Sequence, residues 1–134
     1  MNSLNSILLE GRLVSDGELS YTPKGTAVYK FSIACERFLR EGESDEPKRE
    51  VSFFDVTTWQ RLAEVCAEYL KKGRGVRVVG RLKQDRWTDE QGGARSRVHI
   101  VAEHVEFKPS RNGEKESANA PEGEARQEPK REQQ

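Results

Sequence analysis

The sequence predicts an all-β fold with little α content: a small barrel of five strands with one helix between the third and the fourth strand. Two observations lead to this prediction. Hydrophobic residues recur at every second position in five separate stretches, which is the period of a β-strand. The period changes once, after the third stretch, to that of an amphipathic helix. The strands are predicted over residues 5–14, 27–38, 51–59, 75–87 and 96–107.

One domain accounts for the hydrophobic part of the chain. All ten aromatic residues lie between Tyr21 and Phe107, although the chain has 134 residues. Residues 111–134 contain three alanines as their only hydrophobic residues, and such a segment cannot bury enough apolar surface to fold alone. We therefore expect a folded domain over residues 1–110 and a disordered polar tail over residues 111–134.

The first two predicted strands are separated by a turn. Ile7, Leu9 and Leu13 lie at alternate positions of the first strand, so their side chains share one face. Proline and glycine residues in the segment 17–25 supply the chemistry of a turn. In the second strand Phe38 has the opposite parity to most of the hydrophobic residues, so its ring is expected to be exposed.

A charged segment, the third strand and the helix follow. Residues 40–50 carry eight charges and are predicted to form an exposed loop. The third strand is rich in β-branched and aromatic residues and leads into a helix predicted over residues 60–72. Its hydrophobic residues form one helical stripe, namely Leu62, Val65, Cys66, Tyr69 and Leu70. Lys71 and Lys72 are expected in the last helical turn, and Gly73 is expected to stop the helix.

The last two strands are predicted to form a hairpin. Residues 89–93 have the composition of a hairpin turn, and Pro109 follows the fifth strand. Five strands with one helix between the third and the fourth fit the OB-fold, a Greek-key barrel. A generic open α+β sheet is the alternative that the same pattern permits.

The sequence contains no motif typical of catalysis or cofactor binding. A nucleophile elbow, a Walker phosphate loop and a His-Glu-x-x-His metal helix are all absent. His99 and His104 are five residues apart on one predicted strand and should point to opposite faces, as two ordinary, partly exposed side chains. We therefore expect a protein that is not an enzyme and that holds neither a cofactor nor a metal.

The sequence also lacks targeting signals. Cys35 and Cys66 form neither a disulfide framework nor a CxxC pair. The N-terminus has no basic or apolar region of a signal peptide, and no apolar run approaches the ~20 residues that cross a bilayer. These features predict a soluble, cytoplasmic protein without a membrane partner.

The positive charge of this neutral chain is concentrated around the fourth strand. The 23 basic and 23 acidic residues exclude a polycation that coats nucleic acid by bulk charge. Residues 71–97 nevertheless hold nine basic and only three acidic residues. Odd positions of the fourth strand should project three cations and one indole from one face: Arg77, Arg81, Lys83 and Trp87. A charged face that discourages edge pairing is the alternative.

Aromatic residues on the other strands can extend this face. Phe53 and Trp59 share one parity on the third strand, and Phe38 is expected to be exposed on the second. Single-stranded nucleic acid is bound by rings on which bases stack, beside cations that follow the phosphates. Core packing is the alternative for Phe53 and Trp59, and Asp55 between them argues against a uniformly phosphate-binding face.

Several segments resemble one known family. The most specific are WQRLAE at 59–64, EYLKKG at 68–73, VGRL at 79–82 and RWTD at 86–89, with further matching segments at 5–13, 21–28 and 31–34. In these segments the chain resembles the bacterial single-stranded DNA-binding proteins, which are homo-oligomeric OB-fold proteins of replication and repair.

The resemblance implies a set of binding residues. The base-stacking aromatics would be Phe53, Trp59 and Trp87, with Phe38 as a fourth. The phosphate-contacting cations would be Arg61, Lys72, Lys83 and Arg86, to which the strand pattern adds Arg77 and Arg81. It also implies a homotetramer, in which the exposed edge of the first strand helps to pair subunits.

The end of the chain departs from the family. Members commonly end in an acidic tip with a terminal apolar Pro-Phe, which docks replication and repair enzymes. Residues 128–134 have mixed charge and no aromatic residue, so we do not expect this route of partner recruitment. A solubilising tail is expected instead.

The sequence thus predicts sequence-independent binding of single-stranded DNA in replication, recombination and repair, by a nucleoid-associated protein. Two alternatives stay open. An RNA-binding OB domain would use the same surface. An accessory, protein-interaction module of the replication machinery could share the fold without the binding.

Overall fold

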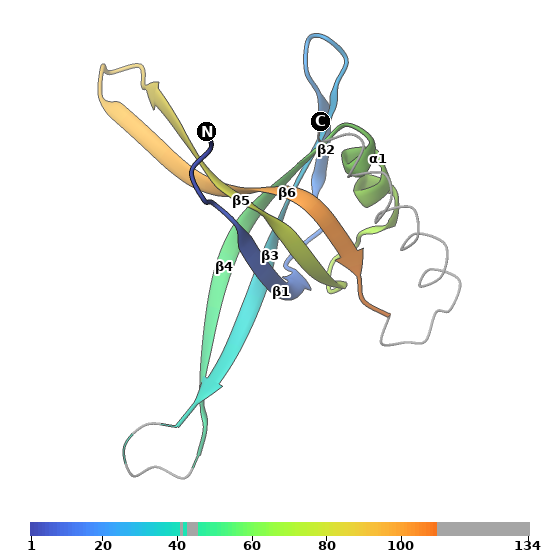
Figure 1. The fold of residues 1–134 in the computed structure, drawn as a ribbon, viewed down its shortest axis with the longest axis vertical. Coiled ribbons are helices and arrows are strands. Elements are labelled where there is room, and N and C mark those ends of the chain that lie inside the picture. Colours follow the sequence, from blue (N-terminus) through green and yellow to red (C-terminus); the bar gives the residue numbers. More distant parts are fainter. Residues whose placement is uncertain (41, 43–45, 110–134) are drawn as a thin grey trace.

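The computed structural model describes residues 1–40, 42 and 46–109, which form a β-barrel with one helix (Figure 1). The elements in chain order are β1 (Ile7–Leu13), β2 (Glu18–Tyr21), β3 (Ala27–Leu39), β4 (Lys48–Trp59), α1 (Gln60–Tyr69), β5 (Gly75–Thr88) and β6 (Ala94–Phe107). The tail predicted over residues 111–134 lies outside the described residues.

Strand β1 closes the barrel. The sheet has the order β1-β5-β6-β4-β3-β2, and β1 also pairs with β3, where Arg12 lies opposite Ala34 and Leu13 opposite Ile33. Only β4 and β6 run parallel among these paired strands. The predicted OB-fold barrel of five strands is therefore confirmed. The open-sheet alternative is wrong because β1 is paired on both sides.

The helix covers one end of the barrel. It packs against β3 and β4, and its stripe residues Leu62, Val65 and Cys66 are buried. Burial raises the pKa of the Cys66 thiol, so this cysteine is a neutral core side chain. Alternate residues of the strands, such as Ile33 and Val78, complete the core. The apolar periodicity of the sequence thus corresponds to the inner surface of the barrel.

A β-bulge changes the orientation of the C-terminal half of β6. Gly80 of β5 lies opposite Ala102, but Val79 lies opposite His104, so β6 has one extra residue between these pairs. Because of the bulge, His99 and His104 both lie opposite odd-numbered residues of β5 and share the outer face. The prediction of opposite faces is wrong, and His99 is 8% exposed instead of partly exposed. The described residues contain no cluster suited to a metal ion.

Strand β2 was not predicted. It lies in the segment interpreted as a turn, and it pairs with the first half of β3, with Tyr21 opposite Ala27. All four of its residues are exposed, so it has no buried face and produces no hydrophobic alternation. The turn itself is shorter than expected: it joins Tyr21 to Ala27 and contains Gly25 at φ 89°.

The hairpin of β3 and β4 is longer, and the helix shorter, than predicted. β3 extends to Leu39 and β4 begins at Lys48, so three residues of the predicted loop 40–50, namely Lys48 to Glu50, belong to a strand. An ion pair of 2.6 Å between Arg49 and Glu36 joins the two strands here, where charged side chains conceal the strand pattern.

The helix ends at Tyr69, so Lys71 and Lys72 lie beyond its last turn. The Arg74 N–H donates to the Lys71 carbonyl, and Gly73 has φ 87° in the turn between them. Gly73 therefore serves this turn and does not stop the helix.

Candidate nucleic-acid interface

The outer face of the barrel is continuous across four strands. Thr57 of β4 lies opposite Val101 of β6, and Val101 lies opposite Arg81 of β5. On the other side of β4, Trp59 lies opposite Val28 of β3. Directly paired residues project to the same face of a sheet, so side chains from β3, β4, β6 and β5 meet on one surface.

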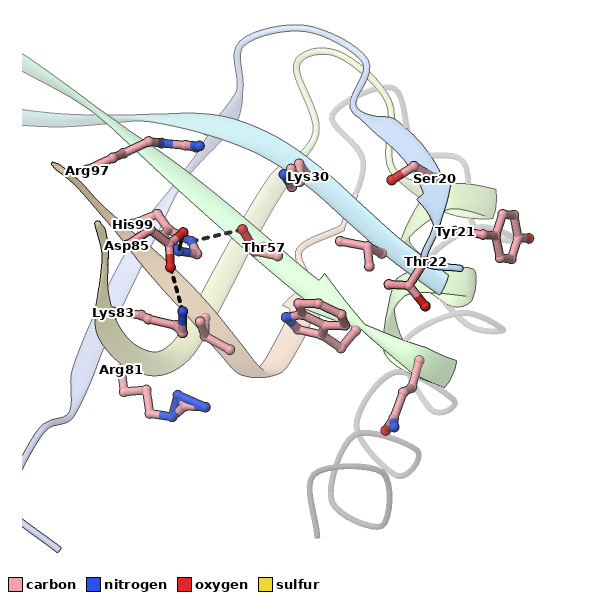
Figure 2. Close-up of a pocket in the computed structure, with 14 residues that line it drawn as sticks. Ser20, Tyr21, Thr22, Lys30, Thr57, Arg81, Lys83, Asp85, Arg97 and His99 are labelled. Atoms are coloured by element: carbon pink, nitrogen blue, oxygen red, sulfur yellow. Dashed lines mark hydrogen bonds and ion pairs between the residues drawn. The ribbon is translucent and has the colours of Figure 1, made fainter. Parts of the chain in front are cut away.

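A groove of about 650 Å³ lies on this outer face, lined by residues of β2 to β6 and by Gln60 of α1 (Figure 2). The lining includes four permanent cations, Lys30, Arg81, Lys83 and Arg97. It also includes the rings of Trp59 and Tyr21. Figure 2 shows the cations of β5 and β6 along one wall and the residues of β2 at the far end. The groove thus combines positive charge with aromatic surface.

A polar network occupies the wall formed by β5 and β6. The Nδ1 atom of His99 lies 3.0 Å from the Thr57 hydroxyl, and its Nε2 atom lies 3.0 Å from an Asp85 carboxylate oxygen. The second contact has the distance of an ion pair but not the geometry of a hydrogen bond. The Lys83 ammonium donates to the other Asp85 oxygen at 2.5 Å. This hydrogen bond holds the pKa of Asp85 below its ordinary value, so the carboxylate is ionised at neutral pH.

Asp55 forms a second acidic position on the same face. Its carboxylate accepts a hydrogen bond of 2.6 Å from the Ser32 hydroxyl and one of 3.3 Å from Arg97. It lines a smaller hollow next to the groove, which also includes Lys30 and Arg97. As expected from the sequence, this face is not uniformly positive.

Two hairpins that project from the barrel carry the other three predicted stacking residues (Figure 1). Phe53 and Phe38 lie on the β3–β4 hairpin and are 65% and 61% exposed, and Trp87 on the β5–β6 hairpin is 48% exposed. Trp59 in the groove is 38% exposed. The core-packing alternative for Phe53 and Trp59 is therefore wrong. Large rings left in contact with water in this number indicate a binding surface.

Comparison with known protein families identifies the chain. Residues 4–108 match the model of the single-strand binding protein family. The chain belongs to this family. It is a family of non-enzymatic DNA-binding proteins, as the sequence predicts for this chain.

Curated members of the family are similar over the same domain. The chain is 43% identical over 107 residues to the single-stranded DNA-binding protein of Treponema pallidum, covering 80% of this chain and 59% of that one. It is 39% identical over 110 residues to single-stranded DNA-binding protein A of Bacillus subtilis, covering 82% and 62%. The chain thus spans about three fifths of the length of these relatives.

A solved structure shares the fold. The Plasmodium falciparum SSB in complex with ssDNA superposes with a TM-score of 0.73 at 26% identity, covering 81% of this chain and 97% of that one. No helix among the described residues of this family member is long and apolar enough to cross a membrane.

Only some of the six predicted phosphate-binding cations of this family member lie together in the groove. Arg81 and Lys83 line the groove. Arg77 lies on the outer face beyond the groove, within 3.8 Å of Glu10 and 3.4 Å of Glu106. Arg86 is at an even position of β5, on the face opposite to Trp87, and donates to the Gln84 side chain at 3.2 Å.

The two predicted cations of the helical region lie outside the groove lining. Arg61 is exposed in the first turn of α1, two residues after Trp59, and has Glu64 at 3.7 Å. Lys72 lies beyond the other end of the helix, where its backbone N–H donates to Asp16. Arg61 thus directly follows the groove residue Gln60 in sequence, whereas Lys72 lies beyond the opposite end of α1.

Sequence reasoning missed three cationic or aromatic residues of the groove. Lys30 has the same parity as Phe38 on β3, so the strand pattern could have indicated it. Tyr21 lies on β2, whose exposed residues gave no signal. Arg97 was counted only as charge, because its place opposite Asp85 depends on the register of β5 and β6.

Proposed function

We propose that this protein binds single-stranded DNA without sequence preference and protects it in replication, recombination and repair, in association with the nucleoid. Bases would stack on Trp59, Trp87, Phe53 and Phe38, and Lys or Arg side chains of the outer face would hold the phosphates. The observation that carries the proposal is the groove, in which Trp59 lies among four cations.

The shape of the surface favours a single strand over a duplex. Base stacking needs exposed ring faces, and each stacked base contributes about 1–3 kcal/mol. Reading a duplex would need a helix or a β-ribbon that enters the major groove. The one helix among the described residues buries its apolar stripe against the barrel, and the two projecting ribbons carry exposed rings, which suit unpaired bases. Membership in the single-strand binding protein family supports the same choice.

A tryptophan-fluorescence titration tests the proposal. An oligo-dT strand should quench the fluorescence of Trp59 and Trp87, and a matched duplex should bind much more weakly. The affinity should fall as salt rises, because each neutralised phosphate releases counterions. Equal affinity for both forms of DNA would contradict the proposal, and so would the absence of quenching by the single strand.

The same titration separates the alternatives. An RNA strand of equal length and sequence that binds more tightly than DNA would identify an RNA-binding OB domain. Weak affinity for both nucleic acids together with a tight protein partner would identify an accessory interaction module. The exposed rings and cations of the groove favour nucleic acid over both a purely structural role and a protein ligand.

We also propose that the protein assembles as a homotetramer through β1. One edge of β1 pairs with β5 along Ile7–Arg12, but the other edge pairs with β3 only at Arg12 and Leu13. Leu8 on this strand is 76% exposed and lies beside an apolar hollow that includes Leu9 and Val79. Such an edge and patch suit pairing with another copy.

Light scattering after size exclusion tests the assembly. The expected mass is four times the 15.3 kDa of one chain. A Leu8→Lys substitution should reduce the mass by placing a charge at the apolar patch. A mass of one chain for the unsubstituted protein would contradict the tetramer.

A further inference from the structure

The groove contains an acidic residue that the proposed binding does not use. Asp85 is the only carboxylate among the described residues that line it, and Lys83 and His99 contact its two oxygens. Its side chain is 41% exposed on the outer face, so it fills no place in the core. An exposed ion pair of this kind adds little to the stability of a protein. The position of Asp85 therefore needs another explanation.

Three cations of the groove already have a carboxylate of the protein within ion-pair distance. Lys83 lies 2.5 Å from Asp85, and Arg97 lies 3.3 Å from Asp55. Arg81 has a longer contact of 3.8 Å with Glu103. An incoming anion thus meets cations on the β5–β6 wall that internal carboxylates have partly neutralised.

We propose that Asp85 is a built-in competitor for nucleic-acid phosphate, whose carboxylate occupies Lys83 until a phosphate displaces it. This inference rests on the proposed binding of single-stranded DNA. A carboxylate and a phosphate both accept hydrogen bonds from an ammonium, so they compete for Lys83. Asp85 then lowers the affinity of the groove and keeps binding reversible.

Charge counting gives the expected effects. With Asp85 ionised, a phosphate that displaces it from Lys83 leaves the carboxylate without its cation, so the two anions share one positive charge and no net counterion is released. Without the carboxylate, one more phosphate is neutralised, which steepens the slope of log K against log salt by about 0.7 for a single strand. The lost repulsion between two anions about 4 Å apart in a high dielectric corresponds to roughly fivefold tighter binding.

The test compares Asp85→Asn with Glu68→Gln in the full chain. Both substitutions remove one negative charge, but Glu68 is exposed on α1 and does not line the groove. Oligo-dT affinity is measured by fluorescence at several salt concentrations, and thermal unfolding confirms that each variant is folded. Asp85→Asn should bind roughly fivefold more tightly than the unsubstituted protein at low salt, with a steeper salt slope, whereas Glu68→Gln should change neither by a comparable amount.

The outcomes distinguish this inference from the proposed function. If the unsubstituted protein fails to bind oligo-dT, both are wrong. If it binds and Asp85→Asn binds equally or more weakly, only the inference is wrong, because Asp85 would then be neutral for binding or would accept a hydrogen bond from a base. If Glu68→Gln tightens binding as much as Asp85→Asn, the tighter binding comes from the changed net charge of the protein and not from the groove. The inference is then again wrong.

Discussion

The groove on the barrel and the tip of the β5–β6 hairpin present similar chemistry on different supports. In the groove, Trp59 lies among cations contributed by three other strands of a closed barrel. At the hairpin tip, Trp87 lies opposite Arg95 on a ribbon of two strands. Tertiary packing of the barrel therefore fixes the position of the Trp59 ring. The position of the Trp87 ring is fixed only by local strand pairing and a turn. Substitutions in the groove should affect binding and the stability of the barrel together, and those at the tip should affect binding with little effect on the stability of the barrel.

Two glycines give the largest expected contrast. A Cβ atom on Gly80 would lie 2.2 Å from the carbonyl oxygen of Val101, which is backbone and cannot move aside without distorting the barrel. A Cβ atom on Gly92 at the hairpin tip would meet only open space, although φ is 84° there. Gly80→Ala should lower the free energy of unfolding by about 2–4 kcal/mol. Gly92→Ala should cost only about 1–2 kcal/mol, confined to the hairpin.

Urea denaturation followed by circular dichroism measures both losses. A loss for Gly92→Ala as large as that for Gly80→Ala would show that the hairpin tip and the barrel unfold as one unit. The expected difference in stability between the barrel and the hairpin tip would then be wrong.

The two tryptophans give the next contrast. Either substitution to alanine should weaken oligo-dT binding by about 1–3 kcal/mol, since each removes one stacking ring. Trp59→Ala should also lower the free energy of unfolding by about 1–2 kcal/mol, because part of its ring is buried. Trp87→Ala should leave the free energy of unfolding within about 0.5 kcal/mol.

Fluorescence anisotropy of a labelled strand, combined with thermal unfolding, separates the two effects. Trp59→Phe serves as the control, because it keeps a ring in the groove and should recover most of the lost affinity. A sharp fall in the melting temperature of Trp87→Ala would mean that this ring is a core residue of the hairpin and not a stacking platform.

The sequence was sufficient for the fold where one side of an element is buried. The alternation in β1, β3 and β5 and the stripe on α1 predicted the barrel, because the core selects hydrophobic residues at those positions. β2 was missed since none of its side chains is buried. The bulge in β6 could not be predicted either, because it depends on the pairing of β6 with Gly80 of β5.

The same distinction applies to the candidate site. Parity along single strands placed Phe53 and Trp59 on one face but left open whether that face is exposed, whereas the expected exposure of Trp87 is confirmed. The contact between His99 and Asp85 joins two strands, and its existence depends on register, which alternation within one strand does not determine. Sequence reasoning therefore indicated Trp59, Arg81 and Lys83 of the groove, but not the contacts that Asp85 makes there with Lys83 and His99.

The smallest expected effect concerns Asp89 at the hairpin tip. One of its carboxylate oxygens accepts hydrogen bonds from the backbone N–H groups of Gly93 at 2.7 Å and Gln91 at 3.0 Å, and the other accepts one from Arg95. These contacts, the Gly93 bond above all, hold the pKa of Asp89 below its ordinary value. Because the pKa is lowered in the folded hairpin, the stabilisation is complete above the unfolded value of about 3.9 and is lost as pH falls through the lowered one.

An NMR titration of the Gly93 amide should follow this change, and Asp89→Asn should abolish it. The signal of Thr57 in the groove can follow Asp85, whose pKa is also lowered, but this change should remain in Asp89→Asn because the tip rests on its own hydrogen bonds. If Asp89→Asn also alters the pH-dependent change of the Thr57 signal, protonation at the tip is transmitted through β5 and β6 to the barrel. The ribbon would then be a rigid extension of the groove, and Trp87 would be fixed by the barrel in the same way as Trp59.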